Sequence, residues 1–416
     1  MKKVIALLLS ALMLTSVFSG CGNKEKTEDE AKTDGKEKVE LFQIKREAVD
    51  TFNKMIEDFQ EENPEITIEQ NNVPDGDKVL PTRMASDDTP AIFTQWPNTA
   101  EFRAQVKDGY VLDLSNESFI KNISENVIKD SAIDGKTYAL PISLNTMGVF
   151  YNVKMFNDLG IKVPTTYGEL IDACKKIKAA GKTPIVFADK DAWTCGQTME
   201  LFYGNFMKDA DATFKDAMDG KKHLNDDAEL KKVAKKILEL HQYSKEDPLG
   251  TSYDDATRAF ANEQSAMFIQ GIWDIPSINK ANPNLEFAMF PMPADKAEDT
   301  KVIVGVDLAL AVSSNTKSKD SALKFLNYMA DPKNAQKYAD LDGSISAVKG
   351  VKCQTKESKA LVDMLNQNKT FPYSEGNWVL GITPDHQKVA QNLIAQNSVD
   401  GFLKDMDSVL FGKAKK

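Results

Sequence analysis

The four tryptophans of the chain stand among residues that favour turns and the ends of helices and strands. Trp96 lies in TQWPN, Trp193 in ADKDAWTCGQ, Trp273 in GIWDIP and Trp378 in SEGNW. An indole ring can cover the apolar C–H face of a ligand, while neighbouring polar side chains hydrogen-bond its hydroxyl groups. A sugar has both kinds of surface. The alternative is that each tryptophan fills a core or a domain interface, which is the usual place of a single tryptophan.

Polar side chains that could complete such a site stand near these tryptophans and after the first expected strand. Lys45, Arg46 and Glu47 end that strand and begin a helix. Arginine offers a fixed fork of donors and glutamate a pair of acceptors, which suits neighbouring hydroxyl groups. The alternative is a charge cluster on the surface at a helix start. Further candidates are Gln95 and Asn98, which flank Trp96, Asp274, which follows Trp273, and Asn145.

One further carboxylate, Asp307, interrupts the apolar run VIVGVDLALAV. A carboxylate inside such a run must be paired, hydrogen-bonded or open to a cleft, because burying it alone is unfavourable. We therefore expect Asp307 either to contact a ligand or to be the structural partner of a hinge-region arginine or of the backbone.

The scaffold for these side chains is expected to alternate strands and helices. Apolar residues at helical spacing predict helices over 47–62, 99–108, 167–180, 228–243 and 318–330, and Gly181 is expected to end the third. Short β-rich runs predict strands at 39–44, 66–68, 91–94, 147–151, 184–187, 265–269, 285–290 and 302–312. Asp134-Gly135 predicts a hairpin turn, and the C-terminal part is expected to be mostly helical. This alternation is typical of α/β layers.

The first twenty residues have the features of an export signal. Lys2 and Lys3 precede an apolar run that is too short to span a bilayer, and the sequence FSGCGN follows it. Small residues before Cys21 resemble the lipobox of bacterial lipoproteins, with Phe18 where leucine is usual; the alternative is an ordinary signal peptide with an incidental cysteine. Residues 22–38 carry eleven charges, so 21–38 are expected to be a lipidated cysteine and a solvated tether. Such a tether spans roughly 20–25 Å.

Composition excludes several classes of protein. The hydrophobic fraction of 42% and the 416-residue length allow two or three packed domains. A net charge of −10 argues against binding nucleic acid, whose phosphates need a basic face. Three histidines in separate segments make a histidine-rich metal site unexpected, and besides Cys21 three cysteines remain, which cannot all pair. Cys174 is expected in a core. No GxSxG, HExxH or P-loop pattern occurs.

Seven stretches resemble, in order, the extracellular solute-binding proteins of bacterial ABC importers, of the maltose- and raffinose-type. They are FQIKREAVDTFNKMIEDFQEENPEI, RMASDDTPAIFTQWPN, DGKTYALPISLNTMGVFYN, VPTTYGELIDACKKIKAAGKTPI, EQSAMFIQGIWDIPSI, VGVDLALAVSSNTKSKDSALKFLNYMADP and GNW. The resemblance matches Trp96, Trp273 and Trp378 most clearly to stacking aromatic residues of that family.

The resemblance implies a periplasmic-binding-protein-like fold, with two α/β lobes joined by hinge strands and the ligand between them. The lobes would be 39–145 with about 307–352, and 146–306 with about 353–416. The chain would cross between them near Asn145-Thr146, near Gly305-Val306-Asp307 and near 349–356.

The implied function is capture of an oligosaccharide and its delivery, by hinge closure, to the permease of an ABC importer. The protein would be a monomer without cofactor or metal, anchored by Cys21 on the extracellular face of the cytoplasmic membrane of a Gram-positive cell. One alternative is a binding protein for a polyamine, iron or a peptide. The other is a lipid-anchored glycoside hydrolase, which needs two suitably spaced carboxylates; with 62 acidic residues the chain cannot exclude such a pair.

Overall fold

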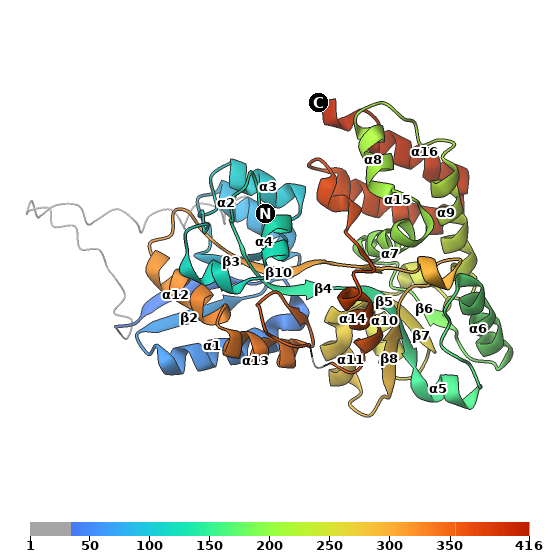
Figure 1. The fold of residues 1–416 in the computed structure, drawn as a ribbon, viewed down its shortest axis with the longest axis horizontal. Helices are drawn as coiled ribbons and strands as arrows, with labels where there is room; N and C mark the ends of the chain where they lie inside the picture. The colour runs from blue at the N-terminus through green and yellow to red at the C-terminus, as the bar shows by residue number, and fades with distance from the viewer. Residues whose placement is uncertain (1–34, 354, 416) are drawn as a thin grey trace, which may run out of the picture. The chain divides into compact units, whose positions relative to one another are not determined.

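The computed structural model describes residues 35–353 and 355–415 (Figure 1). The expected signal segment, Cys21 and most of the expected tether lie outside the described residues. Two larger sheets organise the rest. The strands are β1 (Glu37–Phe42), β2 (Ile66–Asn71), β3 (Ile92–Gln95), β4 (Leu140–Asn145), β5 (Met147–Asn152), β6 (Ile185–Val186), β7 (Met267–Gly271), β8 (Phe287–Phe290), β9 (Val302–Ile303), β10 (Gly305–Val312), β11 (Ile345–Ser346) and β12 (Thr370–Phe371).

Sixteen α-helices lie in the described part of the chain. They are α1 (Val49–Glu62), α2 (Gly76–Ala85), α3 (Ala100–Lys107), α4 (Glu125–Ser131), α5 (Val153–Asp158), α6 (Tyr167–Ala179), α7 (Ala192–Phe206), α8 (Ala210–Met218), α9 (Ala228–His241), α10 (Tyr253–Ala261), α11 (Ile275–Ala281), α12 (Lys319–Met329), α13 (Pro332–Asp342), α14 (Lys359–Asn366), α15 (Ile382–Gln396) and α16 (Val399–Leu410). No helix in this part is both long and apolar enough to cross a membrane.

The first sheet has six strands in the order β11-β4-β10-β3-β1-β2. We call this sheet, with α1–α4, α12 and α13, the first lobe. Strand β10 runs antiparallel to both β3 and β4, and β1 runs parallel to β2 and β3. Figure 1 shows α1 and α13 along one side of this sheet, with α2, α3 and α4 along the other.

The side chains of β10 show why this sheet is covered on both faces. Leu308, Leu310 and Val312 belong to the core beneath α1 and α12, while Ala309 and Ala311 belong to the core with α2 and α3. Successive residues of a strand point to opposite faces, so the large side chains of β10 pack in one core and its alanines pack in the other.

The second sheet has four strands in the order β6-β7-β5-β8. We call this sheet, with β9, β12, α5–α11 and α14–α16, the second lobe; its buried side chains form one large core. Strand β5 lies at the centre and pairs antiparallel with β7 and β8. Cys174 is buried in this core, which confirms that prediction.

Three segments connect the two lobes. The chain leaves the first sheet after β4 and enters the second sheet with β5, so only Thr146 separates the two strands. It returns to the first sheet between β9 and β10. Strand β9 pairs with β12 in the second lobe, and β10 pairs with β4 in the first sheet. The third connection lies between β11 and α14.

Residues 302–312 were expected to form one strand, and that expectation is wrong because the pairing partner changes at Val304. A Cβ atom on Gly305 would lie 2.8 Å from the Tyr373 ring, so this return requires glycine.

Local signals identified the ends of several elements. The turn at Asp134 and Gly135 has φ angles of 50° and 76°, and Ile133 bridges to Lys136, which confirms the hairpin prediction. Gly181 has a φ of 71° just beyond α6, as expected for a residue that ends a helix. Seven helices were not predicted: α2, α4, α5, α7, α8, α10 and α11. Ten of the fifteen residues of α7 are buried, so that helix has no polar face to reveal its period.

Candidate ligand-binding site

Lys45, which lies shortly after the end of β1, forms a buried ion pair with Asp307 of β10. The Lys45 Nζ lies 2.6 Å from Asp307 Oδ2, and the Ser143 hydroxyl donates to the same oxygen at 3.0 Å. Asp307 is only 4% exposed. Burial alone would lower the pKa of Lys45, but the carboxylates of Asp307 and Asp342 outweigh it and hold that pKa above its usual value. Asp307 thus has structural partners, but they are Lys45 and Ser143 and not the hinge-region arginine or backbone offered as the alternative. Its contact with a ligand stays a prediction.

Glu47 reaches from the first lobe to the second. It lies in a 3-10 turn, Arg46–Ala48, and its Oε1 accepts a hydrogen bond from the Tyr253 hydroxyl at 2.7 Å. The same hydroxyl lies 2.8 Å from Oδ1 of Asp274, which follows β7 in the turn Ile272–Asp274. The structure therefore brings together Glu47 and Asp274, which are more than 200 residues apart, at a tyrosine that the sequence-based prediction missed.

Arg46 and Trp193 flank this tyrosine. The exposed Arg46 guanidinium lies 5.9 Å from the centre of the Tyr253 ring and 3.4 Å from Asp254 Oδ2. Trp193 stands in the first turn of α7, half-buried, with its ring edge-on to Tyr253 at 5.1 Å between ring centres. A helix capped by Ser252 places Tyr253 as its first residue. The serine followed by two aspartates could have signalled this helix start.

The other tryptophans differ in exposure. Trp96 is half-buried directly after β3, in a turn where the Thr99 amide donates to its carbonyl. Trp273 is 8% exposed, and its ring covers Gly271 so closely that a Cβ atom there would overlap it. Trp378 is 1% exposed and packs against Phe214 and His386 in the core of the second lobe. Helices α8 and α15 thus cover Trp378, and the stacking role that the resemblance implies for it stays a prediction.

Two of the three predicted amide side chains hold neighbouring elements in place. The Gln95 amide donates to Gln105 of α3 at 2.9 Å, and Asn145 accepts from the Tyr373 hydroxyl at 3.1 Å. Asn98 has a buried Oδ1 with no hydrogen-bond partner among the described residues. Of these three, Asn98 therefore keeps an acceptor available.

Arg103, which the sequence did not single out, joins the lobes at a second place. From α3 it donates to the carbonyl oxygens of Asn98 and Gly376 at 2.9 Å each, and to that of Trp378 at 2.7 Å. Burial lowers the pKa of its guanidinium. All three acceptors are backbone atoms, so this arginine holds a main-chain segment of the second lobe against the first.

A cysteine, an aspartate and a histidine meet in the second lobe without forming a catalytic pair. The Cys195 thiol lies 3.5 Å from Asp189 Oδ1, and His241 Nε2 lies 3.0 Å from Asp189 Oδ2. Nucleophilic catalysis needs the thiol beside the imidazole. Here the thiol faces a carboxylate, and burial and that carboxylate raise the pKa of Cys195. Among the described residues no group of three or more histidine, cysteine and acidic side chains is arranged to hold a metal ion.

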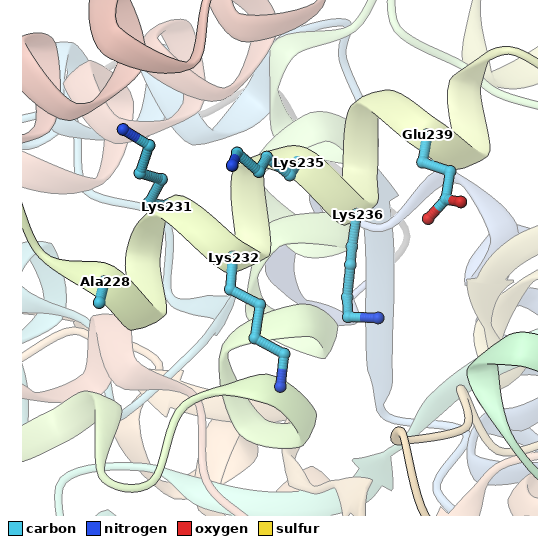
Figure 2. A pocket seen from close by; sticks show the side chains of 6 residues that line it. All are labelled: Ala228, Lys231, Lys232, Lys235, Lys236 and Glu239. Atoms are coloured by element: carbon cyan, nitrogen blue, oxygen red, sulfur yellow. The ribbon is translucent and has the colours of Figure 1, made fainter.

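The surface hollow on α9 has a different character (Figure 2). It has a volume of about 590 Å³ and is lined by Ala228, Lys231, Lys232, Lys235, Lys236 and Glu239. Lys232 and Lys236 both pair with Asp295, at 2.6 and 2.7 Å. The hollow has no aromatic wall, and none of the residues around Tyr253 lines it, so we do not assign the ligand site there.

Comparison with known proteins identifies relatives that span the chain. Residues 49–366 match the family described as bacterial extracellular solute-binding protein. The multiple sugar-binding protein of Streptococcus mutans is 32% identical over 363 residues, which cover 83% of each chain. A structure titled SBP RafE in complex with raffinose has a TM-score of 0.83 at 29% identity, covering 91% of this chain and all of that one. The apo form of RafE from Streptococcus pneumoniae has a TM-score of 0.74 at 28% identity, covering 92% and 99%.

Proposed function

This chain belongs to the bacterial extracellular solute-binding proteins, and from that membership we propose that it captures an oligosaccharide and delivers it to an ABC importer. The observation that carries the proposal is the cluster of Glu47, Trp193, Tyr253 and Asp274, which joins aromatic faces and carboxylates from both lobes. Aromatic faces and fixed acceptors are what a sugar ring and its hydroxyls need. Proteins of this family bind solutes for transport and are not enzymes, which disfavours the hydrolase alternative.

Hinge closure about the three connections is the proposed mechanism. A ligand favours a closed state only through contacts that the open state lacks, so both lobes must touch it. Arg46, Glu47 and Trp96 would act from the first lobe, and Trp193 and Trp273 from the second. The fully buried Asp274 would act through Tyr253. The hydrogen bond from Tyr253 to Glu47 and those from Arg103 to Gly376 and Trp378 join the two lobes, so we assign these contacts to the closed state. The closed protein, acting as a monomer, would then dock on the permease.

A thermal-shift screen of the full-length protein tests the substrate class. The panel contains raffinose-, malto-, xylo- and galacto-oligosaccharides, with spermidine and short peptides as the competing class. A bound ligand raises the melting temperature by mass action, about 2.7 kcal/mol of stabilisation at a hundredfold excess over Kd. We expect the raffinose series to give the largest shift. A shift with the amine or peptide ligands alone would contradict the proposed substrate class.

Alanine at Trp96 or Trp193 is expected to weaken raffinose binding by about 1–3 kcal/mol while leaving folding largely intact. Both side chains are half-buried, so each keeps a face for the ligand and contributes little to a core. Isothermal titration with raffinose measures the loss, and urea unfolding serves as the control. Unchanged affinity in both variants would remove these two residues from the site.

Serine at Cys21 is expected to release the protein from the membrane fraction or to block its processing. We propose that Cys21 is the lipidated first residue of the mature chain, because FSGCGN follows the apolar run and stable anchoring requires two or more acyl chains. Fractionation and intact-mass analysis measure the outcome. Cys353→Ser, at a half-buried thiol far along the chain, is the matched control and should stay anchored. An unmodified mature N-terminus at another residue would contradict the anchor, and with it the placement on the outer face of a Gram-positive membrane.

A further inference from the structure

The hydroxyl group of Tyr253 lies between two carboxylates that come from different lobes. Glu47 Oε1 is 2.7 Å from it and Asp274 Oδ1 is 2.8 Å from it. Tyr253 is 2% exposed and Asp274 is fully buried. The second oxygen of Asp274 accepts from the Thr257 hydroxyl at 2.8 Å. All the oxygen–oxygen distances are those of hydrogen bonds.

If both carboxyl groups are ionised, there are too few hydrogen atoms for both contacts of the Tyr253 hydroxyl to be hydrogen bonds. A phenol carries one hydrogen, and an ionised carboxylate can only accept. Tyr253 can therefore donate to Glu47 or to Asp274, and the remaining contact would set two oxygen atoms together without a hydrogen. The arrangement is satisfied when one carboxyl group is protonated, so that it donates to the phenol oxygen while the phenol donates to the other.

We propose that Tyr253 is a positioning residue for ligand binding, and that closing Glu47 onto it takes up one proton from solvent. The proton goes to Asp274 Oδ1, which donates to the Tyr253 oxygen, and the Tyr253 hydroxyl donates to Glu47 Oε1. In the open state the Tyr253 hydroxyl donates to Asp274, and no extra proton is needed. The proposal rests on the proposed function in that ligand binding drives closure.

The surroundings of this trio favour a neutral Asp274. Burial raises the pKa of Asp274 well above its usual value, and the charge of Glu47 adds to that effect. Burial also raises the pKa of Tyr253, so the phenol keeps its hydrogen at neutral pH. Among the described residues neither Glu47 nor Asp274 has an ion-pair partner within 4.0 Å.

The other charged and titratable groups near the trio have partners of their own. Lys45 binds Asp307 and lies near Asp342, and Tyr338 lies near both of these carboxylates. Arg46 binds Asp254, Arg258 binds Asp255 and Lys280 binds Asp50. Asp191 accepts a hydrogen bond from the Tyr253 amide.

The direction of the pH dependence follows from linkage. The closed state holds the proton more tightly than the open state, so the pKa of Asp274 is higher in the closed state. The affinity gained from the proton is complete below the open-state pKa and is lost as the pH rises through the closed-state pKa. Between these two values raffinose affinity falls by at most about tenfold per pH unit, since one proton is taken up.

Raffinose titrations of the full-length protein test this coupling. Calorimetry from about pH 5 to about pH 8, where folded proteins are commonly most stable, in two buffers of different ionisation heat, counts the protons taken up. We expect uptake that approaches one proton in the wild type. Glu47→Gln and Asp274→Asn each supply the missing hydrogen through an amide, so both should lose the proton uptake whatever their affinity. Asp254→Asn, at an exposed carboxylate beside Tyr253, should keep it.

Two outcomes would overturn the proposal. One is raffinose binding by the wild type with no proton uptake across this range. The other is wild-type uptake that persists in both Glu47→Gln and Asp274→Asn. If raffinose binds at no pH, the proposed substrate has failed, and solution scattering of the unliganded protein then decides the proton coupling. The wild type should become more compact as the pH falls while Glu47→Gln does not respond; a wild type that does not respond either overturns the coupling.

Discussion

Replacing Trp378 with alanine is expected to lower the free energy of unfolding by about 3–5 kcal/mol, the range for large aromatic side chains removed from a core. The ring is 1% exposed and packs edge-on against Phe214 at 6.0 Å and against His386 at 4.6 Å between ring centres. Neither neighbour can fill the space without moving α8 or α15. Urea unfolding followed by circular dichroism measures the loss.

Two further variants separate a core role from a ligand role at this position. Trp378→Phe should lose less, because it keeps an aromatic ring and removes an indole Nε1 that has no hydrogen-bond partner among residues 35–353 and 355–415. Trp193→Ala, at a half-buried ring, should lose less stability than Trp378→Ala. A Trp378→Ala protein of wild-type stability with weakened raffinose binding would instead support the stacking role expected from the sequence.

Replacing Asp307 with asparagine is expected to destabilise the protein by about 3–5 kcal/mol, because it leaves the Lys45 ammonium buried without its closest counter-charge. Asp342 offers only a more distant oxygen, 3.8 Å from the Lys45 Nζ. Lys45→Met in the Asp307→Asn background should recover much of the loss, since the uncompensated charge is then gone. A double-mutant cycle in urea gives the coupling between the two side chains.

An exposed ion pair of the same length is the matched control. Lys38 and Glu69 also lie 2.6 Å apart, but their side chains are 52% and 54% exposed. Glu69→Gln is therefore expected to change stability by about 0.2–1 kcal/mol. If Asp307→Asn keeps wild-type stability and loses raffinose affinity, Asp307 faces the ligand and the structural role is wrong.

The sequence predicted the parts of the fold that depend on local patterns. The turn at Asp134 and Gly135 and the amphipathic helices α1, α6 and α9 all followed from residues close together in the chain. Helix α7 did not, because it is buried on nearly every side. The sequence also predicted a single strand over 302–312, because the apolar run does not show that the pairing partner changes at Val304.

The site was harder to predict because its contacts join distant segments. Lys45 and Asp307 are 262 residues apart, so a carboxylate in an apolar run could be recognised as needing a partner but its partner could not be identified. Glu47 and Asp274 were both named as site candidates, and the structure brings them together at Tyr253, which carries no local signal of that role. Trp378 stands beside serine, glutamate and asparagine, and the polar context hid its burial under α8 and α15.

Arg103 binds the second lobe in a way that does not depend on the side chains of the segment that it contacts. Because its acceptors there are the main-chain oxygens of Gly376 and Trp378, no side chain at 374–378 supplies the contact. A Cβ atom on Gly376 would meet its nearest neighbour at 3.7 Å, an ordinary packing distance. The half-buried and exposed positions 375–377 can thus change during evolution, while the buried Trp378 stays fixed by the core and the contact of Arg103 with the second lobe is kept. The surface of this segment and the attachment between the lobes are therefore free to evolve independently.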